Sequence, residues 1–210
     1  MIVRYGGGND GIVDYLINGR KAERQYTRDE LDHRVVLDGD LQTTDKIIDS
    51  IENKSQERYL HITLSFHESH VSNEVLKAIV DDYKKLLMNA YHPDEYSFYA
   101  EAHLPKIRHI QDNSTGELVE RKPHIHIVIP KVNLITEKFL NPVGDVTKGH
   151  TIEQLDAIQE FINNKYNLDS PKDYPRKDAD YGKIISRVKG DLYKEHHSEL
   201  KGELLSRIEN

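Results

Sequence analysis

The sequence predicts an α+β fold in which a central antiparallel sheet carries helices on one face. Residues 59–66, 96–104 and 121–130 have the pattern of strands, and a strongly amphipathic helix separates the first two. The turn signal Asn113-Ser114-Thr115-Gly116 joins the last two strands as a hairpin. The order strand, helix, strand, strand leaves the polar face of the sheet free to bind a ligand.

The N-terminal residues predict a short strand and a helix. Residues 1–5 are typical of a strand, and Gly6-Gly7-Gly8 is expected to end it. Asn9 or Asp10 can cap the helix that follows, and Gly19 is placed to end it.

Two further helices are expected before the first long strand. Thr27-Arg28-Asp29-Glu30 matches a capping box, and the helix that it opens is expected to include Val35 and Val36. Thr44 is the candidate cap of the next helix, which carries Ile47, Ile48 and Ile51 at helical spacing.

The strongest strand outside the hairpin spans residues 59–66. Its apolar side chains alternate with polar ones, namely Tyr59, His61, Thr63 and Ser65. Ser72 can then cap a long helix, whose apolar stripe is formed by Val75, Leu76, Ile79, Val80, Tyr83, Leu86 and Leu87. The stripe predicts that this helix packs on the apolar face of the sheet.

Histidines mark the polar face of the last strand. His124 and His126 leave the same face, because side chains alternate across a strand, while Ile125, Ile127 and Ile129 enter the core. Two neighbouring imidazoles on a rigid strand are half of a divalent-metal site. The alternative is a strand whose polar face carries histidines without a metal.

A third histidine strengthens the metal prediction. His103 lies on the polar face of the preceding strand. A two-residue turn at 113–114 sets it opposite His124, whereas a four-residue turn sets it opposite His126. Either register brings three imidazoles together, with opposed Cβ atoms about 5 Å apart. The alternative is that Pro105 stops the strand and an irregular excursion follows.

The end of the chain predicts helices on both sides of a linker. Thr151-Ile152-Glu153-Gln154 matches a capping box, residues 170–175 are rich in turn formers, and residues 178–209 have a weak helical stripe. We expect a domain at residues 1–169 and a helical extension at residues 170–210 that lies over the active-site side of the sheet.

Composition limits the classes of function. The chain has 210 residues and no cysteine, so disulfides are excluded and a metal must rest on His, Asp or Glu. No apolar run reaches the ~20 residues that cross a bilayer, and no signal peptide stands out, which predicts a cytoplasmic protein without membrane insertion. The net charge of −7 argues against nucleic acid, but the segments around the histidines are locally basic and can guide phosphate.

These features resemble those of the HUH endonucleases and, among them, the relaxases of mobilisable plasmids. The shared motif is His124-Ile125-His126 in an antiparallel sheet, with His103 at the place of the upstream histidine and residues 59–66 at that of the central strand. Residues 12–21 resemble the segment that carries the nucleophilic tyrosine, here Tyr15. His103 lies farther before the pair than in many relaxases, a distance that a long hairpin arm accommodates.

The resemblance implies a DNA-nicking and rejoining enzyme of plasmid mobilisation. Tyr15 would attack a phosphate polarised by a divalent ion (Mn, Mg or Zn) on the three histidines, leaving a 5′-phosphotyrosyl bond and a free 3′-hydroxyl. Glu101, on the face of His103, and Glu68, after the central strand, are the candidate catalytic carboxylates that would serve as base.

The expected substrate is single-stranded DNA at an origin of transfer. Such DNA needs cations and aromatic faces, and the candidate contacts are Arg20, Lys21, Lys106, Arg121, Lys122, Arg176 and Lys177. The extension at 170–210 is expected to pack over the DNA as a lid. Accessory relaxosome proteins and a secretion coupling protein are the expected protein partners.

Two other functions stay open. A rolling-circle replication initiator or transposase of the same superfamily would use a tyrosine after the histidines, Tyr181 or Tyr193. A non-catalytic metal or nucleic-acid binding module would use no tyrosine. Near the N-terminus, Tyr5 and Tyr26 compete with Tyr15 for the role of nucleophile.

Overall fold

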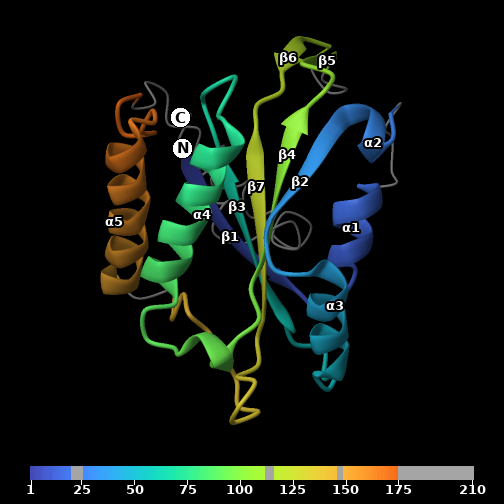
Figure 1. Ribbon diagram of the computed structural model, residues 1–210, viewed down its shortest axis with the longest axis vertical. Coiled ribbons are helices and arrows are strands. Elements are labelled where there is room, and N and C mark those ends of the chain that lie inside the picture. The colour runs from blue at the N-terminus through green and yellow to red at the C-terminus, as the bar shows by residue number, and fades with distance from the viewer. Residues whose placement is uncertain (20–25, 112–115, 146–148, 175–210) are drawn as a thin grey trace, which may run out of the picture. The chain divides into compact units, whose positions relative to one another are not determined.

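Five strands form the central sheet of the computed structural model, which describes residues 1–19, 26–111, 116–145 and 149–174. Every neighbouring pair of strands is antiparallel. Their spatial order is β1 (Ile2–Gly8), β3 (Tyr59–Ser65), β7 (His124–Pro130), β4 (Tyr99–Pro105) and β2 (Asp32–Asp38) (Figure 1). The predicted α+β class with a central antiparallel sheet is confirmed.

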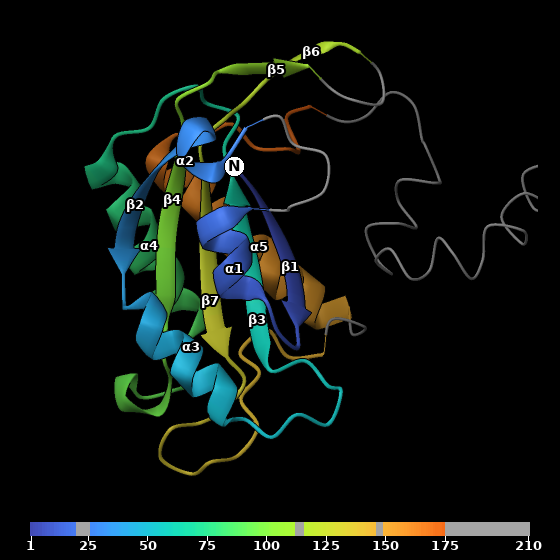
Figure 2. The same ribbon diagram turned by 90° about the vertical axis from the view of Figure 1, so that its right-hand side faces the viewer.

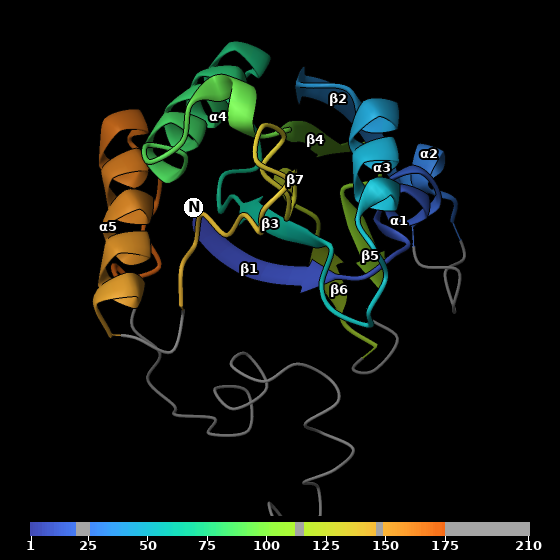
Figure 3. The same cartoon turned by 90° about the horizontal axis from the view of Figure 1, so that it is seen from below.

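Helices lie on both sides of this sheet. They are α1 (Ile12–Asn18), α2 (Arg28–Leu31), α3 (Leu41–Ser50), α4 (Asn73–Leu87) and α5 (Gly149–Tyr166), with a short 3-10 turn, η1 (Pro93–Glu95). α4 and α5 cover one face, and α1, α2 and α3 gather on the other (Figure 3). The expectation of helices on one face alone was therefore too simple, since the polar face is partly roofed by the N-terminal helices.

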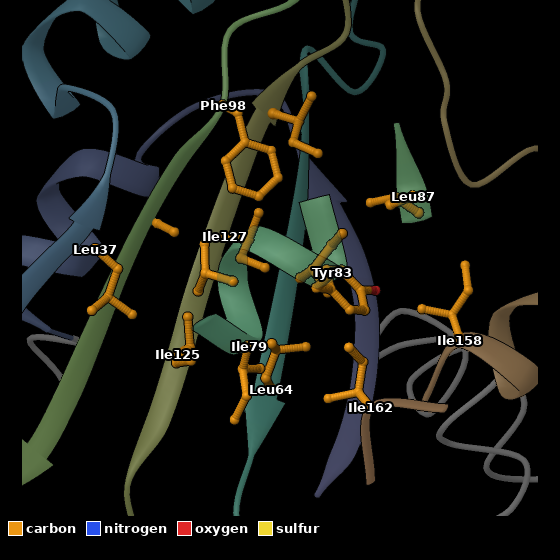
Figure 4. Packing of buried hydrophobic residues seen from close by; sticks show 14 of the residues in the cluster. Leu37, Leu64, Ile79, Tyr83, Leu87, Phe98, Ile125, Ile127, Ile158 and Ile162 are labelled. Carbon is orange, nitrogen blue, oxygen red and sulfur yellow. The ribbon is translucent and has the colours of Figure 1, made fainter. Parts of the chain in front are cut away.

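The main core lies between the sheet and α4 (Figure 4). The apolar side chains of β3 and β7 meet the stripe of α4 there, as the alternation predicted; the contacts include Leu64, Ile79, Tyr83, Ile125 and Ile127. Ser72 caps α4 through its hydroxyl, which accepts from the Val75 amide, so this predicted cap is confirmed.

A smaller core forms on the second face. Ile12 and Leu16 of α1 and Ile48 of α3 pack there against the sheet, on Tyr59, Tyr99 and Val128. α1 has no side-chain cap, because Gly11 occupies the N-cap position in the left-handed region (φ 81°), so neither predicted cap is used. Gly19 follows the last turn with φ 73°, as predicted.

Gly6, Gly7 and Gly8 continue β1 to its end, so the predicted break is wrong. All three pair with β3. A Cβ on Gly7 would lie 2.8 Å from the Tyr59 carbonyl oxygen, and one on Gly8 would meet the Tyr59 ring. Gly7 and Gly8 therefore permit a close approach of β1 to residues of the neighbouring segment instead of ending the strand.

Residues 32–38 form an edge strand where a helix was expected. Thr27 makes the predicted capping box with Glu30, but α2 ends at Leu31. Val35 and Val36 pair with β4, and such β-branched residues suit a strand. Further on, Asp40 caps α3 through the Thr43 amide, so Thr44 is not the cap.

α5 begins at Gly149, so Thr151 lies inside its first turn rather than at the cap. Residues Met1–Asp173 form one compact unit, in which Ser170 bonds to Glu160 on α5. Of the predicted lid at residues 170–210, the part from residue 175 onward, with Tyr181 and Tyr193, falls outside the described residues. Among those described, no helix has the length and apolar character that a bilayer span requires.

The hairpin between β4 and β7 extends beyond the sheet as a two-stranded ribbon of β5 (His109–Gln111) and β6 (Leu118–Glu120) (Figure 2). In the sheet, His103 lies opposite His124, which is the register of the two-residue turn. In the ribbon, His109 lies opposite Glu120, which is the register of the four-residue turn. The register changes because more residues separate His103 from His109 than separate Glu120 from His124.

Candidate functional site

Three histidines converge on the face of the sheet that α1 partly covers. β7 presents His124 and His126 two residues apart, and β4 sets His103 beside them. The ring centroids lie 5.1 Å (His103–His124), 4.6 Å (His103–His126) and 4.9 Å (His124–His126) apart. One nitrogen from each ring lies within 4.8 Å of the others. The hairpin thus builds the predicted cluster, which could hold a metal ion.

The hydrogen bonds of the cluster fit metal ligands. His103 donates from Nε2 to Glu101 Oε1 (2.5 Å), and His126 Nδ1 lies 2.8 Å from His61 Nε2. The other nitrogens, His103 Nδ1 and His126 Nε2, are buried and have no hydrogen-bond partner among the described residues. Buried polar atoms without partners are costly. An ion bound by these nitrogens would remove that cost, and a second-sphere partner on the other nitrogen is usual for metal-binding histidines.

His124, like the other two histidines, has one ring nitrogen bonded to a neighbour. Its Nδ1 donates to the Lys122 carbonyl at 3.3 Å. Burial, with the nearby charge of His103, lowers the pKa of His124 to about 4. Burial and the charges of His124 and His103 also lower the pKa of His126. Both rings are therefore neutral near pH 7, which is the form that binds a metal.

Glu101 is an anchor for His103 rather than a free base. Its carboxylate is fully buried and accepts from Arg34 Nη2 (2.6 Å) and the Tyr99 hydroxyl (2.6 Å) as well as from His103. Burial by itself raises the pKa of Glu101, but the hydrogen bonds from His103, Arg34 and Tyr99 outweigh it and lower the pKa to about 2. A carboxylate that already accepts hydrogen bonds from three side chains differs from the predicted general base.

His61 is a site residue that the sequence reasoning missed. It lies diagonally across from His126 on β3, and the two rings stack with centroids 5.0 Å apart. Burial, followed by the charge of His103, lowers the pKa of His61 to about 4. A neutral His61 can accept the Nδ1 proton of His126, which leaves Nε2 of His126 for a metal. Its place on the polar face of residues 59–66 was the available signal.

α1 brings Tyr15 to the histidines. The Tyr15 ring meets His126 edge-on, with centroids 5.7 Å apart and planes at 89°, and lies 6.0 Å from His61. Tyr5, a competing candidate, bonds to the Tyr83 hydroxyl in the core under α4 and so lies on the opposite face. Of Tyr5 and Tyr15, Tyr15 is thus the candidate nucleophile that the fold places beside the cluster.

Glu68, in the loop between β3 and α4, contacts the segment that follows α5. Its carboxylate accepts from the Asp169 amide at 2.7 Å and from the His67 amide at 3.1 Å. Its described bonds thus tie two loops together, which differs from the predicted role of base.

The cationic candidates for DNA binding are engaged to different degrees. Arg121 makes two bonds to Asp32 (2.7 and 2.9 Å) and one to the Leu31 carbonyl, so it is a partly buried structural cation rather than an open phosphate ligand. Lys106 bonds to the Asp29 carbonyl, and Lys122 to Glu120 and Ser69. The other candidates, Arg20, Lys21, Arg176 and Lys177, fall outside the described residues.

Arg4 is an exposed cation that sequence reasoning did not select. It pairs with Thr63 on β3, which pairs with His126 on β7, so the three side chains leave the same face. Its guanidinium donates weakly to Ser65 at 3.5 Å. The open half of the histidine face therefore carries a positive charge.

The fold and the site define an α+β protein whose antiparallel sheet carries a buried histidine cluster able to bind a metal ion. No protein-family model matches the chain. The chain is similar to cryptic plasmid protein C of Neisseria gonorrhoeae, with 24% identity over 204 residues that cover 93% of this chain and 84% of that protein.

Proposed function

We propose that this protein is a metal-dependent enzyme that nicks and rejoins single-stranded DNA at a plasmid origin of transfer. The observation that carries the proposal is the position of the Tyr15 ring, edge-on to His126 in a cluster whose buried ring nitrogens lack partners. The similarity to a protein named for a plasmid supports plasmid DNA as the substrate. Relaxosome proteins and a secretion coupling protein are the partners that this activity would need.

The chemistry would be a reversible exchange of one phosphodiester for another. The Tyr15 hydroxyl attacks the phosphorus and loses its proton, the bond from phosphorus to O3′ breaks, and O3′ leaves as a hydroxyl. The phosphate then joins the 5′ strand end to Tyr15 until the 3′-hydroxyl attacks in reverse. A divalent ion on the three histidines, when bound, polarises the scissile phosphate and offsets its growing charge.

The chain's own residues prepare these steps. Glu101 and His61 fix the rings of His103 and His126, so that the ligand nitrogens point into the cluster. α1 fixes the phenol beside them. Arg4 is available to bind a neighbouring phosphate, because it is exposed on the same face.

The test uses single-stranded oligonucleotides that tile the plasmid region around the gene, incubated with protein and Mn²⁺. A denaturing gel is expected to show a protein band shifted by covalent DNA. Tyr15→Phe and His126→Ala should abolish the shift, while Tyr5→Phe should retain it because Tyr5 lies on the far face. An adduct that survives Tyr15→Phe but disappears with Tyr181→Phe or Tyr193→Phe would assign the protein to the replication initiators. If no oligonucleotide forms an adduct, the remaining alternative is a non-catalytic binding module.

A further inference from the structure

A chain of ion pairs around the buried Asp32 carboxylate connects the base of the hairpin to Tyr15. Arg121, between β6 and β7, donates from Nη2 to both oxygens of the Asp32 carboxylate. Asp32 accepts from Arg28 Nη1 at 3.0 Å. Arg28 then lies over the Tyr15 ring, with its guanidinium carbon 5.5 Å from the ring centroid, and its Nη2 donates to the Tyr15 carbonyl at 3.4 Å.

A gain in stability does not by itself explain why the charges of Arg28 and Asp32 are buried. Arg28 is 4% exposed and Asp32 is 1% exposed. Buried ion pairs are often no more stabilising than apolar residues of the same size, because desolvation offsets their attraction. In addition, Arg28 Nε is buried without a partner among the described residues. A costly cation placed against one particular tyrosine points to a role in the site.

α1 needs such support. It has seven residues and no side-chain N-cap, and helices this short are marginal by themselves. Ile12 and Leu16 anchor the side that faces the sheet. Arg28 adds a contact to the Tyr15 ring and another to its carbonyl, which restrains both ring rotation and sliding of the helix.

We propose that Arg28 is a positioning residue, which fixes Tyr15 against the histidine cluster and is itself held by Asp32 and Arg121. The inference rests on the proposed function, since it concerns the geometry of attack by Tyr15. A displacement of about 1 Å from that geometry can slow a reaction about 100-fold. Arg28 itself touches neither the DNA nor the ion in this role.

The test compares Arg28→Met, Asp32→Asn and Arg28→Lys with wild-type protein. Lys84→Met is the control, because it removes an ion pair with Asp38 (2.7 Å) that joins α4 to β2. The measurements are the single-turnover rate of adduct formation, the oligonucleotide Kd and the Mn²⁺ affinity from calorimetry.

Arg28→Met and Asp32→Asn are expected to lower the rate about 100-fold, with both affinities within about twofold of the wild-type values. Arg28→Lys should recover part of the rate, since it keeps a cation over the ring. Lys84→Met should react like wild-type protein. Asp32→Asn keeps the shape of the side chain, so it carries the test even if Arg28→Met does not fold.

Three outcomes would overturn the inference. One is a wild-type rate in both Arg28→Met and Asp32→Asn, which would leave the proposed function standing. Another is a loss of Mn²⁺ affinity in parallel with the rate, which would make Arg28 a residue of the fold alone. The third needs no DNA: with 3-fluorotyrosine at position 15, the fluorine NMR shift should move toward that of free fluorotyrosine in Arg28→Met, and an unchanged shift contradicts positioning. Absence of an adduct in wild-type protein would instead refute the proposed function.

Discussion

At the scale of single residues, the cluster depends on partners that are not ligands. His103 and His126 each commit one nitrogen to a neighbour, Glu101 and His61 respectively. The hydrogen bond selects which nitrogen is left for an ion and holds the ring plane. Glu101 is held in turn by Arg34 and Tyr99, so the ligand geometry is fixed from several strands at once.

Substitution of His61 tests this arrangement directly. His61→Phe keeps the ring stack on His126 but removes the acceptor for Nδ1, and the affinity for Mn²⁺ or Zn²⁺ is expected to fall about 10–100-fold. Calorimetric titration measures it. His33→Gln serves as the control, because His33 is exposed on β2. An affinity equal to that of the wild-type protein would show that His61 does not orient His126.

At the scale of elements, β1 depends on glycines for its approach to β3. A Cβ on Gly6 would lie 3.8 Å from the His61 carbonyl oxygen, an ordinary contact, whereas a Cβ on Gly7 would lie 2.6 Å from the Glu57 carboxylate and 2.8 Å from the Tyr59 carbonyl oxygen. The Tyr59 carbonyl belongs to the backbone of a paired strand, so it cannot give way without disturbing the ladder.

The two glycines therefore form a matched pair of sites. Gly7→Ala is expected to lower the free energy of unfolding by about 1–3 kcal/mol, as overpacking does. Gly6→Ala should change it by less than about 0.5 kcal/mol, as at an ordinary surface site. Urea denaturation measures both, and equal effects would contradict the close approach of β1 and β3 at Gly7.

A partly buried hydrogen bond between Tyr5 and Tyr83 (2.8 Å) joins β1 to α4. Burial raises the pKa of Tyr5 to about 12, against the lowering effect of its bond to Tyr83, and burial also raises the pKa of Tyr83. Between pH 10 and pH 12 the unfolded chain loses these protons while the folded protein keeps them. Stability is therefore present below pH 10 and is lost as the pH rises through this window.

The expected slope is about 1.4 kcal/mol per pH unit for each such tyrosine. Denaturation midpoints measured at intervals from pH 9 to pH 12 give the slope. The double variant Tyr5→Phe/Tyr83→Phe should show a smaller loss over the same window, since the other tyrosines remain. If wild-type protein and the double variant lose stability equally, this pair is not what titrates.

At the scale of the whole molecule, a bound ion would join the two arms of the long hairpin in the middle of the sheet. A ligand that binds the folded state alone stabilises it by about 2.7 kcal/mol at a hundredfold excess over its Kd. For a domain of this size we expect Tm to rise by roughly 5–10 °C. Thermal unfolding with and without Mn²⁺ or Zn²⁺ measures the rise.

A chelator should reverse that rise. The variant His124→Ala/His126→Ala should show no metal-dependent change in Tm, because it lacks two of the three ligands. A rise of the same size in this variant would place the ion elsewhere in the molecule.

The sequence by itself determined the features that depend on neighbours along the chain. Alternation decides which side chains of a strand share a face, so the pairing of His124 with His126 and the core positions of β3 followed from residue order. The turn residues of the hairpin limited the register to two solutions, both of which set His103 beside the pair, and the structure has the one in which His103 lies opposite His124. Ser72 and Thr27 cap helices through backbone amides three residues away, which is also a local relation.

Tertiary structure alone decided the features that depend on distant segments. Val35 and Val36 form a strand because they pair with β4. The glycines of β1 remain part of that strand because they pair with β3. His61 and Arg28 gained their places through contacts with His126 and Tyr15 from other elements. The sequence alone indicated that Arg121 was a free cation, whereas the fold pairs it with Asp32. Local patterns fix the direction of a side chain, whereas its partner is fixed only when separate elements pack together and bury the charge or the ring that they share.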